Sequence, residues 1–105
     1  MSTVFQSIKT KQIGTTEVQC YSSTGVSTLI GVNLSNIATQ SITISAYIKS
    51  GGSTYYIIKD TVIPSGNSLS LLKDSKIVLN NGDQLYMISS TATSLDAILS
   101  MIIHP

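Results

Sequence analysis

The stretch Ile42-Thr43-Ile44-Ser45-Ala46-Tyr47-Ile48-Lys49 decides the fold class of this chain. Aliphatic side chains occupy every second position, and Thr, Ser, Tyr and Lys fill the positions between them. Successive side chains of a β-strand point to opposite faces, so this alternation predicts a strand with one buried and one solvated face. Such strands are typical of antiparallel sheets that have one face in water.

Period-two alternation continues along most of the chain, and no window carries a helical pattern with caps at both ends. The further predicted strands are residues 17–22, 30–34, 53–59, 68–72, 76–79, 84–89 and 94–103. Turn residues separate them: Gly51-Gly52, Pro64-Ser65-Gly66-Asn67, and Asn80-Asn81-Gly82-Asp83 as a hairpin between Leu79 and Leu85. The pattern predicts an all-β, single-domain antiparallel β-sandwich, jelly-roll-like or immunoglobulin-like, with about eight strands.

The composition of this 105-residue chain is poor in charge. Only 10% of residues are charged, against about 25% in typical domains, and the net charge is +1 with six lysines and no arginine. Without arginine, a nucleic-acid partner is not expected. A surface depleted of charge indicates a protein that is partly covered by neighbouring subunits. The alternative is an ordinary monomer with a polar, uncharged surface.

The first fifteen residues differ from the rest of the chain. Phe5, Ile8 and Ile13 are spaced too loosely for a strand of the main sheets. We therefore predict an extended N-terminal arm at residues 1–15, either disordered or docked on a neighbouring copy, and a β-sandwich domain at residues 16–105.

Two predicted strands are apolar on both faces. Tyr55-Tyr56-Ile57-Ile58 is one, and the C-terminal strand is the other, since Ile98 and Ile102 lie opposite Leu95, Leu99 and Ile103. In a small two-layer domain, such strands meet either a loop or arm of the same chain or another subunit. We favour another subunit, and the candidate subunit interface consists of Phe5, Ile8, Ile13, Tyr55, Ile57, Ile98 and Ile102.

No pattern of catalytic or metal-binding residues is present. His104 is the sole histidine, and the five acids are isolated in sequence: Glu17, Asp60, Asp74, Asp83 and Asp96. A nucleophilic serine needs a base within reach, and no nucleophile motif or phosphate-binding loop occurs. We predict no enzymatic activity, no cofactor and no metal site. A tiny hydrolase remains an alternative only if the fold assembles an acid pair or a Ser–His contact.

Cys20 is the only cysteine, so no intrachain disulfide can form and a reducing cytoplasm is expected as the site of maturation. We interpret it as a small buried hydrophobe in a strand. No secretory h-region follows Met1, and no apolar run approaches the ~20 residues that span a bilayer. The sequence therefore predicts no membrane partner.

The order of six motifs resembles small structural proteins of tailed bacteriophages, especially cyanophage-type virion proteins. The motifs are Leu29–Asn36, Ser41–Ile48, Tyr55–Asp60, Ile63–Leu69, Ile77–Leu85 and Ser94–Asp96. The similarity covers about residues 16–103. These are strand and turn motifs, which identify a family better than an activity. The chain departs from the pattern at Ser22-Ser23-Thr24-Gly25, where such proteins often carry a Pro-Ala-Gly turn.

This resemblance implies a β-sandwich that forms symmetric oligomers, a trimer or a ring, in the virion. The expected role is capsid cement or decoration, or a neck or tail-attachment subunit, with major capsid, neck or tail proteins as further partners and assembly in the host cytoplasm. The alternative is a carbohydrate- or receptor-binding module of a fibre or tail. That alternative requires an exposed patch of Tyr47, Tyr55 and Tyr56.

Overall fold

The computed structural model describes residues 4–72 and 76–104, so Lys73 and Asp74 lie outside the described residues. The described chain consists of strands and the turns between them. The nine strands are β1 (Val4–Ile13), β2 (Val18–Ser22), β3 (Val26–Asn36), β4 (Ile42–Ser50), β5 (Ser53–Ile63), β6 (Ser68–Leu71), β7 (Ile77–Leu79), β8 (Gln84–Ser89) and β9 (Leu95–His104). All pair antiparallel. The predicted all-β fold class is confirmed.

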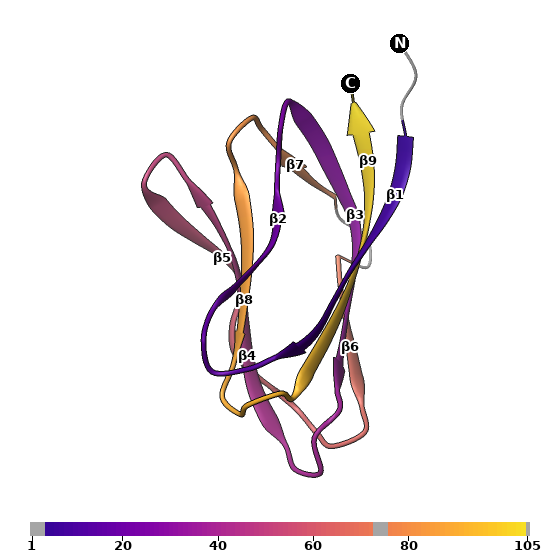
Figure 1. Cartoon of the computed structure of the whole chain (residues 1–105), viewed down its shortest axis with the longest axis vertical. Coiled ribbons are helices and arrows are strands. Elements are labelled where there is room, and N and C mark those ends of the chain that lie inside the picture. The colour runs from indigo at the N-terminus through magenta and orange to yellow at the C-terminus, as the bar shows by residue number, and fades with distance from the viewer. Residues whose placement is uncertain (1–3, 73–75, 105) are drawn as a thin grey trace.

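The strands form two sheets that pack face to face as a sandwich (Figure 1). The five-stranded sheet has the order β1-β9-β3-β6, and β7 also pairs with β3. The four-stranded sheet has the order β2-β8-β4-β5. β3 is long enough to serve two partners, because β7 pairs with its first residues and β6 with its last.

The N-terminal segment corrects one prediction. Val4–Ile13 is a strand, and it pairs with β9 along the edge of the five-stranded sheet, from Val4 opposite Ile103 to Ile13 opposite Leu95. The expectation that these residues stay out of the main sheets is therefore wrong. Its loose apolar spacing has a physical reason: an edge strand buries little of its surface, and most of β1 is exposed.

The turn at Asn80–Asp83 corrects a second prediction, that of a hairpin between Leu79 and Leu85. Asp83 donates its backbone N–H to the carbonyl of Asn80 at 3.0 Å, so the turn itself is present. It does not close a hairpin, because β7 belongs to the five-stranded sheet and β8 to the other. Local Asn-Gly chemistry specifies a reversal, but which sheet receives each strand is settled by packing. The Gly51-Gly52 turn does join a hairpin, β4–β5.

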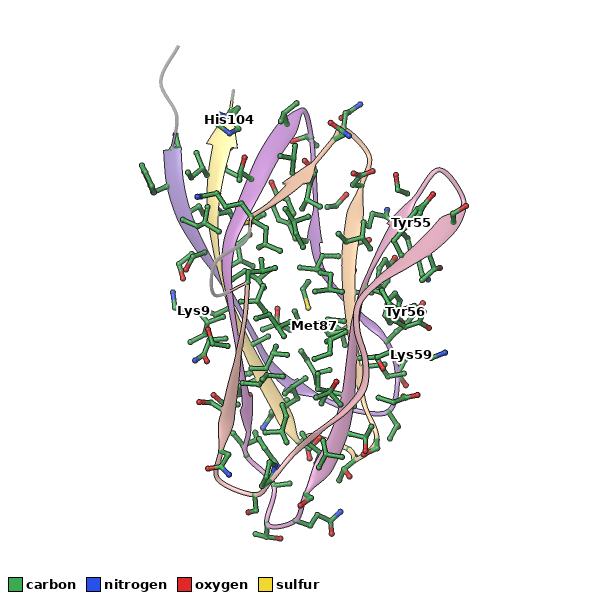
Figure 2. All side chains as sticks on the ribbon, turned by 180° about the vertical axis from the view of Figure 1, so that it is seen from behind. Lys9, Tyr55, Tyr56, Lys59, Met87 and His104 are labelled. Atoms are coloured by element: carbon green, nitrogen blue, oxygen red, sulfur yellow. The ribbon has the colours of Figure 1, made fainter. Side chains whose placement is uncertain are left out.

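The core lies between the sheets and is built by the alternating residues of β3, β4, β8 and β9. Met87 points into this interior (Figure 2). In β4, Ile42, Ile44 and Ala46 are buried as the alternation predicted, but Ser45 and Tyr47 on the expected solvated face are buried as well. Each large aliphatic side chain removed from water contributes about 1.5–3 kcal/mol before the entropy cost of ordering. The fully buried large side chains are Ile13, Leu29, Leu34, Ile42, Ile44, Ile63, Leu79, Leu85, Met87, Leu95, Leu99 and Met101.

Asn36, a buried asparagine at the end of β3, makes three side-chain hydrogen bonds at one end of the sandwich. Its amide donates to the carbonyls of Gln40 and Ile63, both at 2.8 Å, and its Oδ1 accepts the N–H of Ala38 at 2.8 Å. The side chain thereby ties the β3–β4 loop to the end of β5. Among the described residues, every buried side-chain nitrogen and oxygen has a hydrogen-bond partner.

Candidate functional site

An apolar row crosses the outer face of the five-stranded sheet. Phe5 of β1 is opposite Ile102 of β9. Ile102 is opposite Thr28 of β3, which is in turn opposite Val78 of β7. Phe5 is 73% exposed and Val78 is 57% exposed. We call these four residues the outer row. Its ends, Phe5 and Val78, are exposed, while Ile102 and Thr28 between them are partly buried, and no member is charged.

The outer row lies beside further apolar surface. Ile98 is 42% exposed. It lies on the same face of β9 as Ile102, since the two residues are four positions apart in the strand. A shallow hollow of about 400 Å³ adjoins the row and is lined by Phe5, Gln6, Ser7, Ile30, Ser100 and Met101. The outer face of this sheet thus combines exposed apolar side chains with an uncharged depression.

The structure separates the predicted interface residues into three groups. Phe5, Ile98 and Ile102 share the outer face of the five-stranded sheet, and Phe5 is the register partner of Ile102. Tyr55 lies at the other side of the molecule on β5 and is 60% exposed (Figure 2). The other three predicted interface residues are in or against the core.

Ile13, which the sequence predicted at a subunit interface, is completely buried in the core of the chain and leaves no surface for a partner. Ile8 and Ile57 are partly buried and pack against the same core. The reason is the pleat: Ile8 is opposite the inward-facing Leu99, so it points inward too. Val78 was missed by the sequence reasoning, although Ile77-Val78-Leu79 is an apolar run that carries the same two-faced signal as β9.

A second row crosses the outer face of the four-stranded sheet and consists of tyrosines. Tyr86 of β8 is opposite Tyr47 of β4, which is opposite Tyr56 of β5. The ring centroids of Tyr47 and Tyr86 are 6.1 Å apart with nearly parallel planes, and those of Tyr47 and Tyr56 are 5.2 Å apart. The ammonium groups of Lys49 and Lys59 lie 4.3 and 5.1 Å from the Tyr86 and Tyr56 ring centroids.

This packing decides how much free aromatic surface the tyrosines offer. Tyr55 and Tyr56 are exposed, as a saccharide-binding role requires, but Tyr47 is only 6% exposed. Tyr55 and Tyr56 are consecutive in a strand and point to opposite faces. Lysines already stand over Tyr86 and Tyr56. The three predicted tyrosines therefore do not form one flat platform.

Glu17 lies beside the tyrosine row and accepts hydrogen bonds from two residues of β4. Tyr47 donates its hydroxyl hydrogen to Oε1 of Glu17, and the Lys49 ammonium contacts Oε2 at 2.7 Å. Hydrogen bonds from Lys49 and then Tyr47 lower the pKa of the Glu17 carboxyl, and the Glu17 contact raises the pKa of Lys49. Burial, followed by the hydrogen bond to Glu17, raises the pKa of Tyr47 well above its ordinary value. The sequence signalled only that Tyr47 and Lys49 share a face.

The remaining candidates for chemistry have structural partners. Oδ1 of Asp96 accepts the N–H of Gln12 at 2.9 Å, where β1 loses its regular register with β9. His104 Nε2 is 3.1 Å from the Thr28 hydroxyl. Cys20 is buried, as predicted, and burial raises the pKa of its thiol. Within residues 4–72 and 76–104, no three His, Cys, Asp or Glu side chains are grouped to hold a metal ion.

The part of the chain that the structure describes contains no helix long and apolar enough to cross a membrane.

Comparison with known proteins finds relatives in fold only. No family model and no curated protein matches the sequence. A chain from the T13 particle of infectious bursal disease virus is 9% identical, with a TM-score of 0.59 over 97% of this chain and 31% of that one. A chain of the Gx strain of the same virus is 13% identical, with a TM-score of 0.60 over 97% of this chain and 32% of that one.

A chain from Bacillus endospore appendages, which form disulfide-linked pili, is 18% identical, with a TM-score of 0.56 over 96% of this chain and 86% of that one. The present chain thus spans 31–32% of the length of these two viral chains and most of the pilus chain. At these identities the likeness is one of fold. The β-sandwich is a fold that viral particles and a bacterial pilus contain.

Proposed function

We propose that this chain is a structural subunit of a virion that acts by self-association and not by catalysis. The observation that carries the proposal is the outer row, which has no charged member and leaves Phe5 and Val78 exposed to water. Exposed apolar surface of this kind marks interaction sites on soluble proteins. The fold shared with chains of viral particles and of a pilus supports the same role.

The specific setting that we propose is the particle of a tailed bacteriophage. The subunit would decorate or cement the capsid, or attach the neck or tail, as a trimer or ring that contacts the major capsid, neck or tail proteins after assembly in the host cytoplasm. The motif order at residues 16–103 supports this setting. Repetition makes weak contacts sufficient, because many copies held together give high avidity.

Self-association is tested by sedimentation velocity and light scattering on the purified chain. We expect concentration-dependent oligomers, and we expect Val78→Lys to weaken them at least about tenfold because it places a charge in the outer row. Val62→Lys is the matched control, since Val62 is similarly exposed (61%) but lies on β5, outside the outer row. A monomer at all concentrations, which also fails to bind capsids or tails, contradicts the proposal.

The setting is tested separately on purified phage particles. Electron microscopy with gold-labelled antibodies against the chain should show repeated labelling at one location, on the capsid, neck or tail. Particles that contain no copy of the chain by mass spectrometry contradict the phage setting and leave self-association to be judged from the experiment above.

A further inference from the structure

Strands at the margins of a sheet have backbone N–H and C=O groups that no neighbour pairs, so proteins normally protect them. Within the described residues the marginal strands are β1, β2, β5, β6 and β7. Three of these are protected by shortness: β2 has five residues, β6 has four and β7 has three. β1 has ten residues and β5 has eleven. The two long edges are the ones to which another strand can be added.

β1 is protected along one half only. Its second half carries Lys9 and Lys11, a register shift between Thr10 and Ile13, and a positive φ of 57° at Gln12. Its first half, Val4-Phe5-Gln6-Ser7-Ile8, pairs with β9 in unbroken register and has no charge, proline or glycine. This half therefore lacks the devices that normally keep an edge from pairing.

β5 has the same division. Its middle carries Lys59 and Asp60, with a positive φ of 50° at Asp60 and register shifts against β4. Its first residues, Ser53-Thr54-Tyr55-Tyr56, pair with β4 in unbroken register and are uncharged. All four are exposed. The start of β5 is thus the second open edge.

The two open edges lie on opposite sides of the molecule. β1 ends the five-stranded sheet on the side of β2, which it contacts, whereas β5 ends the four-stranded sheet at the side away from β2. Figure 1 shows β1 and β5 at opposite margins of the molecule. Figure 2 shows Lys9 of β1 at one side and Tyr55 and Tyr56 of β5 at the other. Two different patches on opposite sides join copies head to tail, and such contacts close into rings or continue as filaments.

We propose that the start of β5 in one copy adds as a strand to the first half of β1 in the next copy, which continues a sheet from subunit to subunit. The occupant is a second copy of this chain, because both edges are uncharged, are open over four to five residues and carry exposed aromatic side chains, Phe5 on one and Tyr55 and Tyr56 on the other. Phe5 and Tyr55 or Tyr56 then meet across strands, a pairing that stabilises sheets. This proposal rests on the proposed self-association and adds an edge contact to the one that the outer row provides.

Chemical cross-linking tests the head-to-tail contact directly. In a Cys20→Ala background, one sample of Phe5→Cys, one of Tyr55→Cys and an equimolar mixture are treated with a short bis-maleimide. We expect cross-linked dimers in the mixture at least about tenfold above either variant alone, because the contact joins unlike edges. Val62→Cys replaces Tyr55→Cys in the control mixture, where cross-linking should stay at background.

The outcomes separate the two proposals. Cross-linking of Phe5→Cys with itself shows like edges meeting and overturns the head-to-tail contact, as does an oligomer without any mixed cross-link; both leave self-association standing. A chain that stays monomeric contradicts both proposals.

Hydrogen exchange of the unmodified chain provides a second measurement that needs no substitution. On oligomerisation, those amides of residues 4–8 and 53–56 that point away from β9 and β4 should exchange at least about tenfold more slowly, because strand addition gives them carbonyl partners. Unchanged exchange in both segments while oligomers form contradicts the strand addition.

Discussion

At the scale of single residues, Glu17 contacts both Tyr47 and Lys49 on the outer face of the four-stranded sheet. Its carboxylate accepts hydrogen bonds from the Tyr47 hydroxyl and the Lys49 ammonium, and the Lys49 ammonium also lies over the Tyr86 ring. Glu17 precedes β2, so the cluster links the connection after β1 to β4 and β8. Among the described residues, this ion pair between Glu17 and Lys49 borders the tyrosine row.

The Glu17 contact predicts a pH dependence of folding. Because its folded-state pKa is lowered, Glu17 contributes stability above the ordinary carboxyl range, and this contribution is lost as the pH falls through the folded-state value. We expect Glu17→Gln to lower the urea midpoint at pH 7 and to have the same midpoint as the wild type well below about pH 4. Equal differences at both pH values, measured by circular dichroism, contradict this role.

At the scale of elements, β9 carries the two contrasting surfaces of the five-stranded sheet. It lies between β1 and β3, so its backbone is paired on both sides. Leu95, Leu99 and Met101 are buried, while Ile98 and Ile102 belong to the outer face. One strand therefore supplies the core and the surface that we propose for assembly.

Neighbouring substitutions in β9 should have very different effects. Leu99→Ala leaves a cavity in the core and should lower the free energy of unfolding by about 2–5 kcal/mol. Ile98→Ala should change it by less than about 0.5 kcal/mol in dilute solution, because the side chain is partly in water. Urea unfolding of both variants checks the register. Similar losses for the two substitutions contradict the alternation described for β9.

At the scale of the whole molecule, the positions of the charged residues and of the open strand edges determine how we expect copies to join. The uncharged halves of β1 and β5 lie at opposite sides, and the lysines and register shifts occupy the other halves. The outer row adds apolar surface next to the open half of β1. Backbone pairing and apolar burial are thus the forces available for joining copies.

Association by these forces should respond weakly to simple salt. Screening shortens the Debye length from about 8 Å at physiological ionic strength to about 3 Å at 1 M, but the proposed contact has no charged pair to screen. We expect the dissociation constant from sedimentation to change less than about threefold over this range and to fall in sulfate, which favours burial. Dissociation of the oligomers by sodium chloride alone contradicts an uncharged contact.

Alternation predicted the fold class and most strands because each inward residue of a strand such as β4 is recognisable from its own neighbours in sequence. Alternation did not predict β1 as a strand, because an edge strand leaves most of its side chains in water. Only its final residue, Ile13, is fully buried. The faces of the predicted interface residues show the same limit. Phe5 and Ile98 are exposed, but an isolated isoleucine such as Ile8 reveals its face only once its partner strand is known.

Period-two patterning and turn chemistry are local properties, so the amino-acid sequence alone specified an all-β sandwich, the buried face of β4 and the scarcity of charge. The partners of each strand depend on contacts between residues far apart in the chain. Only the folded arrangement therefore sends β7 and β8 to different sheets, joins Glu17 to Tyr47 and Lys49, and aligns Phe5 with Ile102, Thr28 and Val78. The two open edges on opposite sides are likewise a product of the packed sheets.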